Sequence, residues 1–83
     1  MSKKEKLVAR LLAIPRNFTY NEAKTLMGIL GFEESNKGHT SGSIVEFFKG
    51  DYSVILHKPH PGNELKPYQV RQLIEYLTRN NLI

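Results

Sequence analysis

The chain has 83 residues, 40% of them hydrophobic and 24% charged, which is typical of one small globular domain. The absence of cysteine excludes disulfide scaffolds and thiolate metal sites, and no apolar run approaches the roughly 20 residues that a membrane span needs. Twelve basic against eight acidic residues give a net charge of +4, which favours an acidic partner such as RNA or DNA.

The first 16 residues carry the whole charge excess on a helical pattern. They hold five basic residues against Glu5, and the rest of the chain is balanced at seven of each sign. Apolar residues at positions 7, 8, 11 and 12 follow helical spacing, and Pro15 predicts that this helix ends near Ala13. The segment is either a nucleic-acid footprint centred on Lys3, Lys4, Lys6 and Arg10 or a solvated helix end. Because the chain starts with charged residues, we expect no secretory signal and a cytoplasmic location.

A second helix is predicted to start after Thr19. The run from Thr19 to Glu22 is a capping-box pattern, in which the hydroxyl and the carboxylate satisfy two backbone amides at the helix start. Behind it, apolar residues at positions 23, 26, 27 and 30 form one stripe. Gly31 stands where a left-handed residue would end the helix.

The middle of the chain is typical of three strands. Residues 32–36, 43–49 and 52–57 are the predicted strands, and the small-residue segment 37–42 is a loop. The pair at 50–51, Gly followed by Asp, predicts a tight hairpin between the second and third strands.

A last helix is predicted from Pro67, since proline suits a first helical turn and apolar residues recur at positions 70, 73, 74 and 77. The order helix, helix, three strands, helix predicts a two-layer α+β domain over residues 1–83, with a three-stranded antiparallel sheet covered by helices. Val45 and Phe47 should face the core, and Ile44 and Glu46 the opposite side. The predicted core comprises Leu26, Met27, Phe47, Val70, Leu73, Ile74 and Leu77, with Val54 or Ile55.

Three histidines, His39, His57 and His60, are candidates for proton transfer, since imidazole titrates near neutral pH. In RNA cleavage, a general base takes the 2′-hydroxyl proton and a cation stabilises the charge that develops, a role open to Lys37 and Lys58. Each histidine could instead only satisfy a backbone carbonyl. The pair at 57 and 60 has no carboxylate nearby with ligand spacing, so we expect no metal and no cofactor. The loop from Gly38 to Ser43 could hold a phosphate or simply connect two strands.

Several of these residues together resemble the HicA-type toxins, also called YcfA-like proteins. The resemblance is carried by Gly31-Phe32, by Gly42-Ser43 followed by Phe47, and by the run from His60 to Lys66 with a helix behind it. It covers about residues 19–83, and residues 1–18 form an extra basic helix. The resemblance implies a double-stranded-RNA-binding-like fold and ribonucleases that cut messenger RNA in toxin–antitoxin pairs. It also implies a HicB-type antitoxin that covers the active face.

The sequence departs from the family at one position. The resemblance implies a catalytic histidine directly after the glycine-serine pair, but Ile44 stands there and cannot accept a proton. Either binding is kept without cleavage, or a neighbouring histidine substitutes, with His39 as the candidate, so whether the chain is an enzyme stays open. A non-catalytic protein-interaction module that uses the same sheet face is the alternative function. The residues we expect to bind RNA are Lys37, His39, Ser43, His57, Lys58 and His60.

Overall fold

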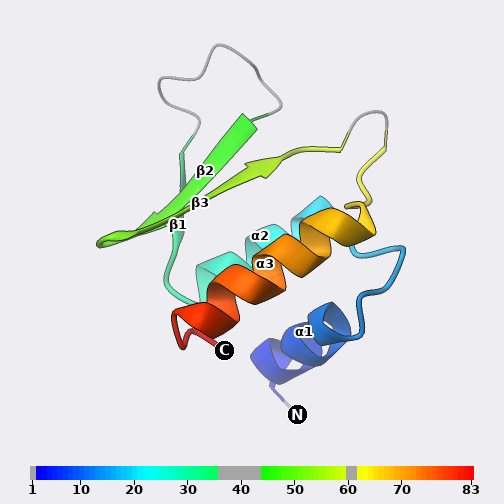
Figure 1. Cartoon of the computed structure of the whole chain (residues 1–83), viewed down its shortest axis with the longest axis horizontal. Coiled ribbons are helices and arrows are strands. Elements are labelled where there is room, and N and C mark those ends of the chain that lie inside the picture. Colours follow the sequence, from blue (N-terminus) through cyan, green and yellow to red (C-terminus); the bar gives the residue numbers. More distant parts are fainter. Residues whose placement is uncertain (1, 36–43, 60–61) are drawn as a thin grey trace.

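The computed structural model describes residues 2–35, 44–59 and 62–83, and its elements follow the predicted order (Figure 1). They are α1 (Lys3–Leu12), α2 (Tyr20–Ile29), β1 (Glu33–Ser35), β2 (Ile44–Lys49), β3 (Tyr52–His57) and α3 (Pro67–Arg79). In the described part of the chain, no helix has the length and apolar character needed to cross a membrane.

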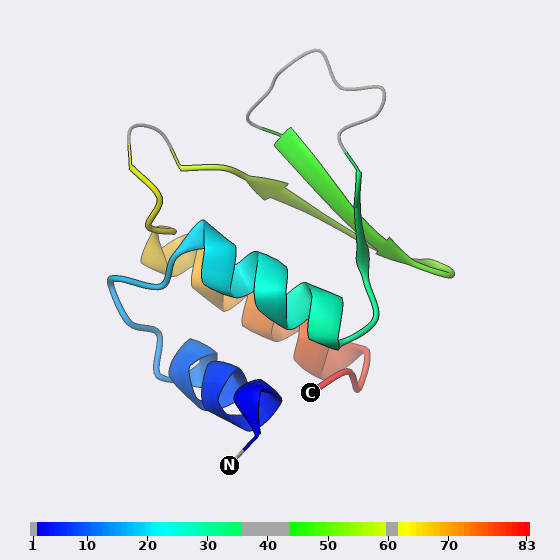
Figure 2. The ribbon, with the colours of Figure 1, turned by 180° about the vertical axis from the view of Figure 1, so that it is seen from behind.

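The three strands form one antiparallel sheet in the order β1-β2-β3, and the helices all lie on one side of it. Figures 1 and 2 show α2 and α3 against the sheet, and α1 beyond them on the side turned away from the strands. The α+β class with an additional N-terminal helix is therefore confirmed. The helical cover of the sheet comes from α2 and α3, because two helices already span a sheet this narrow, and α1 packs on those helices instead.

Both predicted ends of α2 are present. Thr19 Oγ1 accepts from the Glu22 N–H at 3.1 Å, and Glu22 Oε1 accepts from the Thr19 N–H at 3.0 Å, which completes the capping box. At the other end, Gly31 has a φ of 95°, and the Phe32 N–H donates to the Met27 carbonyl at 2.8 Å. These are the features of a Schellman motif, which turns the chain from α2 into β1.

The core is largely the predicted one. Val45 and Phe47 are buried on the helix side of the sheet, and Val54, rather than the exposed Ile55, completes the layer. The prediction for Ile74 is wrong, because this side chain is only half-buried. On α3 the buried stripe is centred on Val70, Leu73 and Leu77, and Ile74 lies on its flank.

A short antiparallel contact joins the starts of α2 and α3. The Leu65 N–H donates to the Phe18 carbonyl at 2.8 Å, and the Tyr20 N–H donates to the Asn63 carbonyl at 2.7 Å. Phe18 and Leu65 are both buried beneath this contact. The two helices that cover the sheet are thus held together at the end where β3 leaves it.

Candidate functional site

The candidate site lies where β2 begins and β3 ends. Ile44 is directly opposite His57 in the β2–β3 ladder, and the ladder closes with Lys49 opposite Tyr52 at the two-residue turn. In a hairpin with such a turn the closing pair is hydrogen-bonded, and bonded pairs then alternate with non-bonded ones. Counting back from the turn makes Ile44 and His57 a non-bonded pair, the arrangement in which opposite side chains approach most closely. Both lie on the face of the sheet that the helices leave uncovered.

The position of His57 is fixed through α3. Gln69 Nε2 donates to the His57 carbonyl at 3.1 Å, while Gln69 Oε1 accepts from the Lys66 N–H at 2.9 Å. One glutamine therefore ties the end of β3 to the first turn of α3. At the other end of the strand, the Ser53 N–H donates to Tyr76 Oη at 2.9 Å. The free edge of β3 is held to α3 at both ends.

A hollow of about 240 Å³ remains between these two attachments. Residues Ser53 to His57 of β3 line one side of it, and Tyr68, Gln69, Gln72, Leu73 and Tyr76 of α3 line the other. The side chains of Ile55 and Tyr68 are 58% and 54% exposed. The wall therefore combines apolar surface, an aromatic ring and polar groups, as small-ligand sites do.

Lys58 lies on the other side of the sheet from His57. Its Nζ stands 5.5 Å from the centre of the Tyr20 ring, which packs against Phe47 on the helix side. Tyr20 Oη donates to Glu34 at 2.5 Å, and both burial and this carboxylate raise the pKa of Tyr20 far above its usual value. Because successive strand residues point to opposite faces, His57 and Lys58 do not form one cluster.

Of the residues expected to bind RNA, only His57 and Lys58 can be placed. Lys37, His39, Ser43 and His60 lie outside the described residues, so their roles stay predictions, including the candidate role of His39 in catalysis. Within the described ranges, no group of three or more His, Asp or Glu side chains is placed to hold a metal ion. Lys66, Tyr68 and Gln69, which lie beside His57, were not among the residues predicted from the sequence. No local signal pointed to them, because their place beside His57 depends on how α3 packs against β3.

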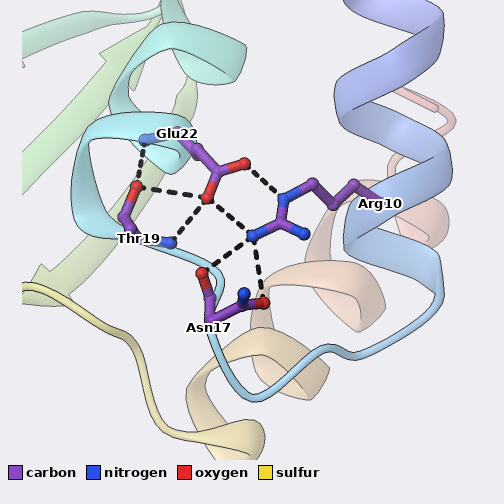
Figure 3. Close-up of polar contacts among 4 residues, drawn as sticks. All are labelled: Arg10, Asn17, Thr19 and Glu22. Atoms are coloured by element: carbon purple, nitrogen blue, oxygen red, sulfur yellow. Dashed lines mark hydrogen bonds and ion pairs between the residues drawn. The ribbon is translucent and has the colours of Figure 1, made fainter.

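Arg10 is part of a polar cluster that ties α1 to the start of α2 (Figure 3). Its guanidinium pairs with both carboxylate oxygens of Glu22, and its Nη2 also donates to the Asn17 carbonyl at 2.8 Å and to Asn17 Oδ1 at 3.1 Å. Glu22 is the same carboxylate that caps α2 through Thr19. Arg10 is therefore a structural residue, unlike its neighbours in the basic segment. Lys3, Lys4 and Lys6 are exposed and form no ion pair with any residue that the structure describes.

The Glu22 cluster should make the fold sensitive to acid. The hydrogen bond from Arg10, helped by the Thr19 N–H, holds the pKa of Glu22 below its usual value. The unfolded chain then binds a proton more readily than the folded one. The stability contributed by Glu22 is present above the unfolded pKa of about 4.3 and is lost as the pH falls through the folded pKa. We expect urea unfolding to show less loss of stability in Glu22→Gln than in the parent between about pH 6 and pH 3.

The matched control is Glu33→Gln. Glu33 is exposed on β1 and makes no ion pair with a described residue. The Glu33→Gln variant should therefore lose as much stability as the parent when the pH falls. The same pH dependence in the parent and in Glu22→Gln would show that the Arg10 contact adds nothing to stability.

A protein-family model described as HicA toxin of bacterial toxin-antitoxin matches residues 20–77. The matched segment runs from the first residue of α2 into α3, so it contains His57, the hollow beside it and the whole sheet. It leaves α1 outside, as expected from the resemblance in the sequence. Searches of curated proteins and of solved structures give no match.

Proposed function

Because the chain belongs to the HicA toxin family of bacterial toxin–antitoxin systems, we propose that it acts on messenger RNA in the cytoplasm. RNA is bound where β2 begins, β3 ends and α3 starts. His57 supports this location most directly, since it is exposed and lies opposite Ile44, the position to which the resemblance assigns the catalytic residue. An imidazole is thus present beside that position, on the neighbouring strand.

Positive charge is available at the same place. Lys66 precedes the first turn of α3, its side chain is exposed, and its backbone is linked to His57 through Gln69. Lys58 follows His57 and reaches toward the other face of the sheet. Together they can contact phosphates on either side of the strand end. The helix α1, which carries Lys3, Lys4 and Lys6, lies beyond α2 and α3 on the side turned away from the strands.

The uncovered sheet face also suits a HicB-type antitoxin. Phe48 and Ile55 are exposed on it, at 37% and 58%, and the half-exposed Ile44 lies on the same face. Large apolar side chains grouped on one face are typical of a protein-binding surface. An antitoxin seated on this face would cover His57. The same observation supports the alternative, a protein-interaction module that does not act on RNA.

Salt-dependent RNA binding tests this proposal. We expect the Kd of the parent for a labelled single-stranded RNA to rise steeply with salt, because bound phosphates release counterions. Replacing Lys58 and Lys66 with glutamine should weaken binding for all sequences alike and lower the salt slope by about one for each lysine. The matched control is the triple change of Lys3, Lys4 and Lys6 to glutamine, which should leave the slope unchanged.

Two results would contradict the proposal. Negligible RNA binding by the parent at low salt, with the antitoxin still bound, would favour the protein-interaction module. A slope that falls only in the α1 triple variant would place RNA on α1 instead of the sheet.

A further inference from the structure

We propose that the hollow between β3 and α3 receives one unstacked base of a single-stranded RNA. This inference rests on the proposed function and adds to it the part of the RNA that is read and the residues that read it. It is carried by the backbone of the β3 edge, by the two attachments to α3 and by an exposed aromatic ring.

The edge of β3 presents backbone groups to the hollow. The Ser53 N–H and the His57 carbonyl both point toward α3, where they bond Tyr76 and Gln69, and not toward β2. Since bonding direction alternates along a strand, Ile55, midway between them, also directs its N–H and carbonyl to this edge. Neither group of Ile55 is hydrogen-bonded to another residue within the described ranges. One donor and one acceptor therefore stand side by side at the wall of the hollow.

The same contacts decide what kind of ligand fits. An added β-strand would need the whole edge, but Tyr76 already occupies the Ser53 N–H, and Gln69 occupies the His57 carbonyl. Between these residues the edge is about 13 Å long, at roughly 3.3 Å per residue. A hollow of about 240 Å³ whose edge is occupied at both ends by these contacts suits a flat ring system better than an extended peptide. We therefore favour a nucleobase over a strand of a protein partner.

The remaining wall supplies what base recognition needs. Tyr68 lines the hollow and is 54% exposed, so a base can stack on its ring. Gln72 adds an amide, which can donate and accept. Together with Ile55, these groups suit a base that carries a donor and an acceptor on one edge. A base can leave its neighbours and stack on Tyr68 only in an unpaired nucleotide, so the substrate should be single-stranded.

The hollow is also close enough to His57 to position the RNA backbone. His57 follows Ile55 by two residues, which is about 7 Å along the strand. A base held at Ile55 therefore places its own sugar and phosphate near the imidazole. Base recognition and any chemistry at the adjacent phosphate would then use one continuous surface.

The test compares three labelled RNAs of equal length: one single-stranded, one with a central abasic nucleotide, and one double-stranded. Each is titrated into the parent, Tyr68→Ala, Gln72→Ala and the control Thr78→Ala, which changes an exposed residue of α3 outside the hollow. We expect Tyr68→Ala to weaken binding of the intact single strand about tenfold, given the usual contribution of one stacked base. Gln72→Ala should weaken it less, and Thr78→Ala should match the parent.

The abasic and duplex RNAs identify the contact. The parent should bind both more weakly than the intact strand, and Tyr68→Ala should bind the abasic RNA as the parent does, with an unchanged salt slope. The base site would be wrong if Tyr68→Ala lost affinity equally for the intact and the abasic RNA. It would also be wrong if Tyr68→Ala lost no affinity while salt-dependent binding persisted. In both cases the proposed function would remain. Loss of antitoxin binding in Tyr68→Ala with RNA binding intact would assign the hollow to a protein. An absence of RNA binding by the parent would overturn both proposals.

A second measurement does not depend on the variants. In NMR titrations of the parent with nucleoside monophosphates, the amide of Ile55 should shift for bases with a matching donor and acceptor. Ribose 5-phosphate, which has no base, should leave it unmoved. A shift with ribose 5-phosphate alone would show a phosphate site and contradict the assignment.

Discussion

The Ile44→His variant is expected to cleave single-stranded RNA at least about a hundredfold faster than the parent, because a positioned general base contributes roughly 10²–10⁴ to such rates. The parent should cleave feebly, since isoleucine cannot accept a proton. The substitution should not disturb folding. Ile44 is half-exposed on the uncovered sheet face, and the buried residues of β2 are its neighbours on the other face, Val45 and Phe47.

His57 explains why the gain should be large. The new imidazole would lie opposite it in a non-bonded pair, with Cα atoms about 4.5 Å apart. A neutral imidazole can take the proton of the 2′-hydroxyl as this oxygen attacks the phosphorus. The other, protonated, can give a proton to the 5′-oxygen as its bond to phosphorus breaks. The products are a 2′,3′-cyclic phosphate and a free 5′-hydroxyl, so atoms and charge balance.

Three further variants separate the possible proton acceptors. Ile44→Gln is the matched control, which is polar but does not titrate, and it should stay at the level of the parent. His57→Gln should remove most of the gain in the Ile44→His background, as a double-mutant cycle would report. If His39 already serves the parent, its weak cleavage should vanish in His39→Ala. Strong cleavage by the parent that survives both His39→Ala and His57→Gln would contradict this account and leave His60 as the candidate.

Leu11→Ala is expected to lower the free energy of unfolding by about 2–4 kcal/mol, as for other leucines removed from a closed core. In a domain of this size, that is a fall in Tm of roughly 10–20 °C. Leu11 is 0% exposed, although it belongs to α1, and the adjacent Leu12 is 51% exposed. Leu12→Ala is therefore the matched control and should change stability by less than about 0.5 kcal/mol.

Leu73 of α3 provides the reference for the stability that a buried leucine of this domain contributes. Leu73 is 2% exposed, and Leu73→Ala should cost the same 2–4 kcal/mol in urea unfolding. If Leu11→Ala resembled Leu12→Ala and not Leu73→Ala, α1 would be an appendage on the segment matched by the family model. An equal cost would show that residues 1–83 fold as one domain, with α1 inside its core.

Elements with local signals were predictable from the sequence. The capping box at Thr19 and the glycine at 31 set the ends of α2, since each is satisfied within a few residues. The turn at 50–51 set the hairpin in the same way. The place of α1 was not predictable, because the spacing of Leu7 and Leu11 shows that one face is apolar but not which surface that face meets.

The candidate site was predictable only in part. His57 and Lys58 were predicted together as RNA-binding residues, although strand alternation already separates their side chains. The contact of His57 with Gln69 joins residues from two elements and depends on how α3 docks. No local pattern encodes that docking, so the hollow beside β3 could not be foreseen. The roles of Lys37, His39, Ser43 and His60 stay predictions.

The double use of Glu22 has a consequence for how the chain opens. Its carboxylate caps α2 through Thr19 and also receives Arg10 from α1. When α1 detaches, the Arg10 guanidinium leaves Glu22 and Asn17 together, and the loop loses its contact with α1 in the same step. We therefore expect α1, the loop after it and the first turn of α2 to unfold together as one cooperative unit. Their amide hydrogens should exchange with solvent at a common rate while the sheet stays folded.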